Sequence, residues 1–372
     1  MPHFVLDRDG LGSLITALRG GGRRVVGPVL DSQVVRFAEI ESIDDLPAGW
    51  TMEVGPGRAR AVRRNDDALF GYAAAPNGLK ELLFPPHRTL WRATREDGRV
   101  RFEACREEPD PTAVIGARPC DLAAASVQDR IFTGSGHQDP DYSARRRDLF
   151  VVAVQCTEAA PTCFCTSFGT GPAATAGFDI ALTEIVDDTR HIFVAETGSD
   201  RGAALLDALP RSPAGTEQLV MARQAVAQAA ASIRRRMPTD GLRNLLASQL
   251  QAGRWNAIAE RCLACSNCTL VCPTCFCVST EDTRSLDGSD ASKVRRWDSC
   301  FSLDFSYMGG HPVRASVGAR YRHWLTHKLS TWVDQFGTFG CVGCGRCIVW
   351  CPVGIDLTEE VAALRATEAI HA

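Results

Sequence analysis

The sequence predicts a mixed α/β domain with a partly parallel sheet over residues 1–239 and a mostly α-helical domain over residues 240–372. Three observations lead to this prediction. Short apolar segments alternate with amphipathic ones between residues 112 and 209, as in folds where strands and helices alternate along the chain. A helix-forming stretch that ends at Pro238 separates the two regions. Beyond it, the cysteines crowd together at regular spacing.

Two short apolar runs predict the parallel part of the sheet. Residues 112–116 (TAVIG) and 149–155 (LFVVAVQ) have the composition of strands that are buried on both faces. Asp121 is a candidate N-cap for a helix from Leu122 to Phe132, which would connect these strands. A strand, a helix and a strand in that order favour parallel pairing. Further elements are predicted as strands at 178–185 and 191–195 and as a helix at 202–209, whereas residues 1–100 predict strands and turns without a defined topology.

The boundary between the two regions is placed near residue 240. Residues 217–236 are rich in alanine and amphipathic, which predicts one long helix. Pro238 ends this helix, and Asp240 is a candidate N-cap for the next one. The next helix carries leucines at helical spacing: Leu242, Leu245, Leu246 and Leu250.

Composition and charge narrow the function classes. The chain has 372 residues, with 41 Lys and Arg against 44 Asp and Glu, so its net charge is −3. This near balance argues against a nucleic-acid-binding protein, because such domains usually carry an excess of positive charge. No apolar run reaches the length of about 18 residues that predicts a membrane span, and the N-terminal residues lack the apolar core of a signal peptide. We therefore expect a cytoplasmic protein with reduced thiols, in which clustered cysteines indicate metal binding more than disulfides.

Eight of the 16 cysteines form one motif twice. Each copy reads C-x2-C-x2-C-x3-C-P, which is the spacing of two-cluster ferredoxins. Three thiolates in one tight loop can bind three corners of a 4Fe–4S cluster, whereas the fourth cysteine points away and ligates the other cluster. The motifs therefore predict a first cluster on Cys262, Cys265, Cys268 and Cys351, and a second cluster on Cys341, Cys344, Cys347 and Cys272. Two zinc sites are the alternative, although zinc sites usually combine separate C-x2-C pairs.

The segment between the two motifs, residues 273–340, is long for a ferredoxin and is predicted to be mostly helical. The second region is therefore expected to be an enlarged, mostly α-helical dicluster ferredoxin domain. Three cysteines of this segment belong to neither motif: Cys275, Cys277 and Cys300. They could coordinate something extra, but we expect them to pack beside the clusters as small, polarizable side chains.

A second group of cysteines lies in the first region: Cys120, Cys156, Cys163 and Cys165. Two of them directly follow the predicted parallel strands, whose carboxyl ends meet at one edge of a sheet. The other two lie in the next loop, and the glycine-rich segment 169–174 after them predicts a turn that lets the backbone approach a cluster. We expect the four thiols to hold a third 4Fe–4S cluster, located away from the ferredoxin pair. A zinc site or four buried, reduced thiols are the alternatives.

Six segments of the chain resemble a known family. They are GARPCDLAA (116–124), DPDYSARR (139–146), CTEAAPTCFCTSFGTGP (156–172), RCLACSNCTLVCPTCFC (261–277), RRWDSC (295–300) and CVGCGRCIVWCPVGID (341–356). These segments are similar to the beta subunit of soluble, NAD(P)-linked nickel–iron hydrogenases, the sulfhydrogenase beta subunit. The A subunit of anaerobic sulfite reductase is similar in the same places. The resemblance extends from about residue 50 to residue 356.

The resemblance implies an electron-transfer subunit of an oxidoreductase complex. It implies 4Fe–4S clusters as cofactors. As partners it implies the small and large subunits of a nickel–iron hydrogenase and a FAD-containing reductase subunit that binds NAD(P). The alternative is the electron-input subunit of an anaerobic sulfite or polysulfide reductase.

The residues themselves also favour a relay. A nickel–iron centre needs C-x2-C pairs near both ends of a large subunit, and the sequence has none outside the ferredoxin motifs. It also lacks a flavin or nicotinamide fingerprint and the cysteine spacing of siroheme ligation. We therefore predict that the chain contains no catalytic residues of its own. A free-standing iron–sulfur sensor would need a DNA-reading helix and a basic face, which the net charge of −3 disfavours.

Overall fold

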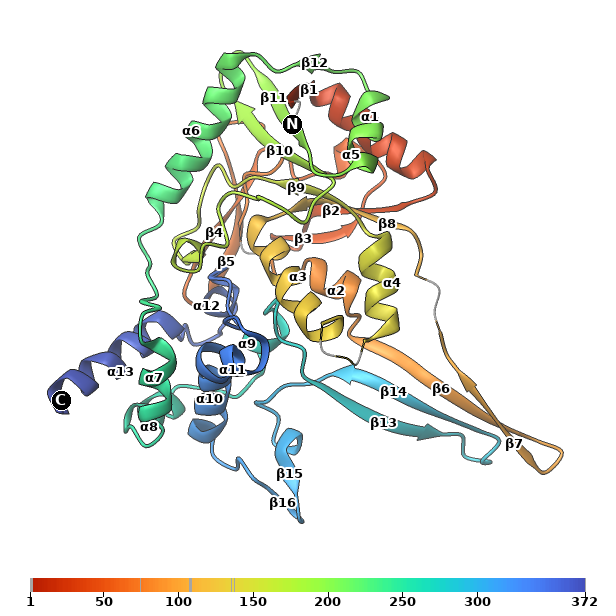
Figure 1. Cartoon of the computed structure of the whole chain (residues 1–372), viewed down its shortest axis with the longest axis vertical. Coiled ribbons are helices and arrows are strands. Elements are labelled where there is room, and N and C mark those ends of the chain that lie inside the picture. The colour runs from red at the N-terminus through yellow and green to blue at the C-terminus, as the bar shows by residue number, and fades with distance from the viewer. Residues whose placement is uncertain (1–2, 74, 107–108, 135, 137, 372) are drawn as a thin grey trace.

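A computed structural model describes residues 3–73, 75–106, 109–134, 136 and 138–371. Its centre is an eight-stranded sheet with the strand order β12-β1-β11-β10-β9-β8-β2-β3 (Figure 1). The strands are β1 (His3–Asp7), β2 (Arg24–Asp31), β3 (Val34–Glu39), β8 (Thr112–Ala117), β9 (Phe150–Val154), β10 (Ile180–Val186), β11 (His191–Thr197) and β12 (Ser212–Pro213). The helices around this sheet are α1 (Arg8–Gly20), α2 (Leu79–Leu83), α3 (Pro119–Phe132), α4 (Pro140–Asp148), α5 (Asp200–Asp207) and α6 (Thr216–Ser232). Figure 1 shows α1 and α5 on one side of the sheet and α2, α3 and α4 on the other.

The middle of the sheet is parallel. Strands β2, β8, β9 and β10 pair in parallel, and the pairs on either side of them are antiparallel. Strand β9 is buried along its whole length and β8 almost so, which is why both appear in the sequence as unbroken apolar runs. The prediction of a mixed, partly parallel sheet is confirmed.

The helix between these two strands begins earlier than predicted. Helix α3 starts at Pro119, so Asp121 lies in its first turn and is not its N-cap. A proline is well suited to this position because its fixed φ matches the helix and its missing N–H would have no partner there. The Asp121 carboxylate accepts the backbone N–H of Arg118 at 3.0 Å. This early start places Cys120 inside the first turn, directly after β8.

The N-terminal residues, whose topology the sequence did not define, include a hairpin that reaches the cysteine motifs. Its strands are β4 (Trp50–Gly55) and β5 (Arg58–Arg63). The N–H of Gly57 in the turn donates to the Ile348 carbonyl at 3.1 Å. A Cβ at this position would lie 2.9 Å from the Cys351 carbonyl oxygen, so only glycine fits.

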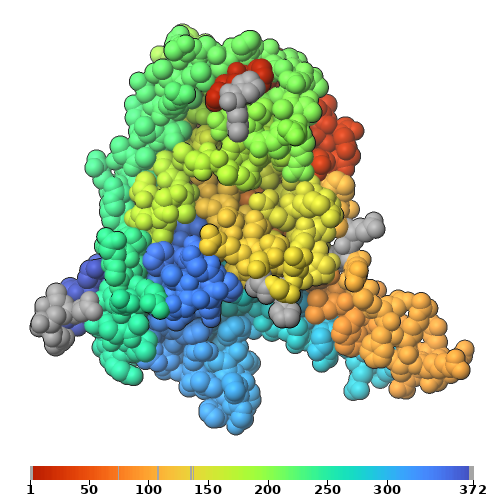
Figure 2. All heavy atoms as spheres, in the orientation of Figure 1, coloured from red at the N-terminus to blue at the C-terminus, as the bar shows by residue number. Residues whose placement is uncertain are grey.

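A second sheet joins segments from both halves of the chain. Its order is β13-β14-β6-β7, with β6 (His87–Glu96), β7 (Arg99–Ala104), β13 (Val278–Arg284) and β14 (Asp290–Trp297). The two hairpins extend away from the body of the molecule (Figures 1 and 2). The prediction that residues 273–340 are mostly helical is therefore wrong for this hairpin. The pairing of β14 with β6 satisfies the backbone hydrogen bonds of the hairpin and buries Val294. The free energy gained from these tertiary contacts outweighs the local helix propensity.

Apart from the short hairpin of β15 (Tyr307–Met308) and β16 (His311–Pro312), the remaining C-terminal elements are helical, and they enclose a second apolar core. They are α7 (Leu242–Ser248), α8 (Arg254–Ala259), α9 (Asn267–Leu270), α10 (Val317–Thr326), a π-helix (His327–Thr331), α11 (Trp332–Phe336), α12 (Arg346–Val349) and α13 (Leu357–His371). The core includes Leu246, Ile258, Phe301 and Leu325. Helix α7 begins after Gly241, whose φ is +65°, so Asp240 is not its N-cap. The boundary near residue 240 stays a prediction.

The described helices lack the features of a membrane-spanning helix. Within the described residues, every helix is too short or too polar to cross a bilayer.

Candidate iron–sulfur sites

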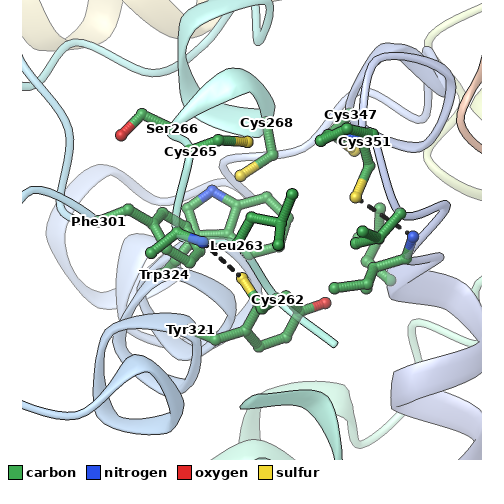
Figure 3. Close-up of a pocket in the computed structure, with 15 residues that line it drawn as sticks. Cys262, Leu263, Cys265, Ser266, Cys268, Phe301, Tyr321, Trp324, Cys347 and Cys351 are labelled. Carbon is green, nitrogen blue, oxygen red and sulfur yellow. Dashed lines mark hydrogen bonds between the residues drawn. The ribbon is translucent and has the colours of Figure 1, made fainter. Parts of the chain in front are cut away.

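The four cysteines predicted to hold the first cluster line one hollow. Cys262, Cys265, Cys268 and Cys351 line it together with Cys347 of the second motif. Figure 3 shows Cys262 and Cys268 across this space from Cys351. Phe301, Tyr321 and Trp324 form its apolar wall. The arrangement therefore joins three cysteines of the first motif to the last cysteine of the second.

Backbone N–H groups point at the sulfur atoms of these loops. Ala264 N lies 3.4 Å from Cys262 Sγ, and Ile355 N lies 3.3 Å from Cys351 Sγ (dashed in Figure 3). An N–H donor favours a negatively charged sulfur over a neutral thiol, so these contacts suit thiolate ligands. Such donors also tune the reduction potential of a bound cluster.

The two motif loops have the same backbone conformation. Ala264 and Ser266 in the first loop have positive φ of 50° and 69°, and Gly343 and Gly345 at the same positions of the second loop have 64° and 72°. Gly343 N approaches Cys341 Sγ at 3.5 Å, which matches the corresponding contact in the first loop. The equal spacing of the cysteines thus produces equal loops.

Only the second loop requires glycine for reasons of space. A Cβ at Gly343 would lie 2.6 Å from the backbone of Phe164, and a Cβ at Gly345 would lie 2.3 Å from the Thr162 carbonyl oxygen. Phe164 N also donates to the Gly343 carbonyl at 2.8 Å. The second motif therefore packs backbone to backbone against the loop that carries Cys163.

The second predicted set is buried more deeply than the first. Cys272 is 9% exposed and lies close enough to Cys341 and Cys344 for their charges to interact. Its sulfur is 3.1 Å from Thr274 Oγ1 and 3.2 Å from Lys328 Nζ. The fourth cysteine of the first motif thus lies beside the second loop, as the crossed assignment requires.

The four N-terminal cysteines converge. Cys120, Cys156, Cys163 and Cys165 line one hollow, which Gly171 and Pro172 of the glycine-rich turn also line. Cys344 of the second motif lines the same hollow. The expectation that this site lies away from the ferredoxin pair is therefore wrong. The physical reason is the close backbone packing of the Cys163 loop on the second motif, which the sequence spacing alone does not reveal.

Buried cations surround the N-terminal hollow. Arg118 is 7% exposed and donates to the carbonyls of Tyr72 (2.8 Å) and Gln155 (3.3 Å). Arg346, from the second motif, is 3% exposed and donates to the Ala75 carbonyl at 2.8 Å. Sequence reasoning missed both arginines, although each adjoins a cysteine motif, as Arg118-Pro-Cys and Arg346-Cys.

Burial controls the pKa of most of these thiols. It raises the pKa of Cys163, Cys165 and Cys341 to about 12. Cys272 differs, because a hydrogen bond from the Cys275 thiol and the nearby Lys328 ammonium lower its pKa well below its ordinary value. Binding of metal to the other thiols must therefore release protons.

The donor sets suit a cubane cluster better than a single ion. The thiolate ligands of a cubane surround a hollow, whereas those of one zinc ion converge on a point. Across the part of the chain that the structure describes, no three His, Cys, Asp or Glu side chains are placed to hold one metal ion. The first set and the N-terminal set each line a hollow instead.

Comparison with known proteins adds to this geometry. Residues 261–355 match the model of a 4Fe–4S dicluster domain. The chain is also 30% identical over 347 residues to sulfhydrogenase 2 subunit beta of Pyrococcus furiosus, and the match covers 92% of each chain. The chain belongs to the sulfhydrogenase beta-subunit family. This confirms the family predicted from the sequence segments, and no solved structure matches the chain.

The three remaining cysteines of this family member's dicluster region lie next to the candidate ligands. Cys275 and Cys300 are buried and Cys277 is half-buried. Cys277 and Cys300 pack in the second apolar core, and Cys275 Sγ lies 3.5 Å from Lys328 Nζ. These positions agree with the packing role expected for them.

Proposed function

We propose that this chain is the electron-transfer iron–sulfur subunit of a soluble, NAD(P)-linked nickel–iron hydrogenase. It would relay electrons between the hydrogenase module, with its small and large subunits, and a reductase subunit that contains FAD and binds NAD(P). The reduced thiols of such a relay require a reducing compartment, so we place it in the cytoplasm. The observation that carries the proposal is the arrangement of three cysteine sets in a row.

The order of the sets follows from the residues that they share. Cys347 of the second set also lines the first hollow, and Cys344 of the second set lines the N-terminal hollow. The second set therefore lies between the other two. When bound, 4Fe–4S clusters supply one-electron carriers whose potentials depend on charge, hydrogen bonds and burial. The protein contributes the thiolates of each site and the backbone N–H donors beside Cys262, Cys341 and Cys351.

One end of the row opens to the surface. Cys265 is exposed, and the apolar side chains of Leu263 and Val353 beside it are 63% and 36% exposed. At the other end, the N-terminal hollow is lined by Glu158, whose side chain is 56% exposed. Access at two ends is what a bridge between two partner subunits needs.

Family membership supports the choice of partner. The relative in Pyrococcus furiosus is named as a subunit of a sulfhydrogenase. We therefore propose that the chain serves a hydrogenase and contains no catalytic residues of its own. The alternative function is that of the electron-input subunit of a sulfite or polysulfide reductase. A siroheme protein among the partners in the test below would favour this alternative.

The decisive experiment is purification of the native complex under anaerobic conditions. Identification of its subunits, with metal and flavin analysis, should reveal nickel and FAD in other chains. The isolated, iron-loaded chain should accept electrons from a strong reductant but neither consume hydrogen nor oxidise NADPH. Stoichiometric flavin in the isolated chain, or NADPH oxidation by it, would contradict the proposal.

A further inference from the structure

Lys328 is a buried lysine at the centre of the dicluster region. It is 3% exposed and lies in the π-helix His327–Thr331, which follows α10. Its ammonium sits between two indole rings, 5.9 Å from the Trp324 centroid and 5.6 Å from the Trp332 centroid. A π-helical turn is rare and is often found at functional sites, where it redirects a side chain.

The ammonium contacts the predicted ligands of the second cluster. Its Nζ lies 3.2 Å from Cys272 Sγ, 3.5 Å from Cys275 Sγ and 3.2 Å from Thr274 Oγ1. It also donates a hydrogen bond to the carbonyl of Gly340 at 2.8 Å. Gly340 directly precedes the second motif. None of these described hydrogen-bond partners is a carboxylate.

A buried cation needs a negative partner. Leaving a charge buried without one is strongly destabilising. Arg346, the neighbouring buried cation, has the Asp121 carboxylate 2.8 Å away. The atom beside Lys328 that can become negative is the sulfur of Cys272, to which the Cys275 thiol donates a hydrogen bond. The charge of Lys328 is therefore placed to compensate thiolate and cluster charge.

We infer that Lys328 is a positioning residue that sets the reduction potential of the second cluster. A positive charge and an N–H donor at a ligand sulfur favour the more negative, reduced state and so raise the potential. Lys328 also ties Cys272 of the first motif to Gly340 beside the second, and Thr274 Oγ1 reinforces this tie by donating to the same carbonyl at 2.7 Å. The inference rests on the proposed function only in that the second set holds a cluster.

The test is a redox titration of the iron-loaded full chain, monitored by electron paramagnetic resonance. Lys328→Met should lower the midpoint potential of the second cluster and leave that of the first cluster unchanged. Lys328→Arg keeps the charge and should restore most of the shift. Lys293→Met is the control, because Lys293 on β14 pairs with the Asp282 carboxylate at 3.0 Å and lies outside the hollows that the cysteines line.

Each outcome of this titration either supports or contradicts the inference. An unchanged potential in Lys328→Met, or an equal shift in Lys293→Met, would overturn the inference. If Lys328→Met loses the second cluster, the inference stands only where Lys328→Arg retains that cluster with a midpoint potential close to that of the wild type. Loss of that cluster in both variants would mean that the lysine acts through its shape, which contradicts the inference. Absence of the second cluster from the wild-type chain, shown by iron content, would instead refute the proposed function.

Discussion

Arg346 Nη1 and Asp121 Oδ1 lie 2.8 Å apart as an ion pair that is almost completely buried, with side-chain exposures of 4% and 1%. Asp121 follows Cys120 of the N-terminal set, and Arg346 precedes Cys347 of the second set. The pair therefore joins helix α3 of the α/β sheet region to helix α12 of the dicluster region. Correct placement of one cysteine set thus depends on the other.

Breaking this pair should destabilise the whole chain. Asp121→Asn leaves the buried guanidinium of Arg346 without its charge partner, and we expect a loss of about 3–5 kcal/mol in the free energy of unfolding. Unfolding by denaturant under anaerobic conditions, monitored by circular dichroism, measures this loss of stability. Asp187→Asn is the control, because it breaks a pair with Arg190 (3.0 Å) at the surface and should change stability little. Equal effects of the two substitutions would contradict the role assigned to the buried pair.

The crossed ligation predicts which cluster each cysteine supports. Cys272→Ser should damage the second cluster and leave the first mostly intact, because Cys272 lies beside Cys341 and Cys344. Iron content and electron paramagnetic resonance of the reduced chain measure this. Cys265→Ser supplies the spectrum of a chain without the first cluster, and Cys105→Ser, at a half-buried thiol outside both motifs, should resemble the wild type. Loss of the first cluster alone in Cys272→Ser would overturn the crossed assignment.

Iron counting tests the N-terminal site. With three 4Fe–4S clusters the reconstituted chain should bind about twelve irons, and Cys163→Ala should reduce this to about eight. Cys105→Ala is the control, since this half-buried thiol follows β7 and lies outside the hollow. A wild-type count of about eight that Cys163→Ala leaves unchanged would show that the N-terminal cysteines are structural.

The glycines of the second motif should be irreplaceable, whereas the first motif accepts larger residues. Gly345→Ser forces a Cβ to within 2.3 Å of the Thr162 carbonyl oxygen and adds about 1 kcal/mol of left-handed backbone strain. We expect lower iron content in the second and N-terminal sites and a lower melting temperature. Ser266→Gly makes the reverse change at the equivalent position and should be well tolerated. If Gly345→Ser retains full iron content, the backbone contact between the two loops is looser than the structure indicates.

A half-buried histidine, His323, should make stability dependent on pH. Burial lowers the pKa of His323 to about 4, below the ordinary value of 6.5. The unfolded chain therefore binds more protons between these values, so stability falls as the pH is lowered from 6.5 toward 4, by at most about 1.4 kcal/mol per pH unit. His323→Gln should flatten this dependence, whereas His311→Gln, at an exposed site on β16 (His311–Pro312), should not. Melting temperatures at pH 7, 6 and 5 measure the effect, and parallel profiles for wild type and His323→Gln would refute it.

The sequence by itself determined the features that depend on local spacing and composition. Unbroken apolar runs identified β8 and β9, because a strand buried on both faces needs apolar residues at every position. Each copy of the cysteine motif predicted one tight loop, and Ser266 and Gly345 have similar positive φ values at the same position of the two loops. Both signals arise within a few residues of chain, where backbone geometry relates spacing directly to structure.

Only the tertiary structure decided the features that depend on contacts between distant segments. It placed the Cys163 loop against Gly343, turned residues 278–297 into a hairpin on β6, and brought Lys328 to Cys272. None of these contacts produces a periodic pattern of residues in the sequence, because each joins segments that are far apart along the chain. Their positions are set by burial of apolar surface and pairing of buried charges over the whole chain, and these act on the assembled fold rather than on any local stretch.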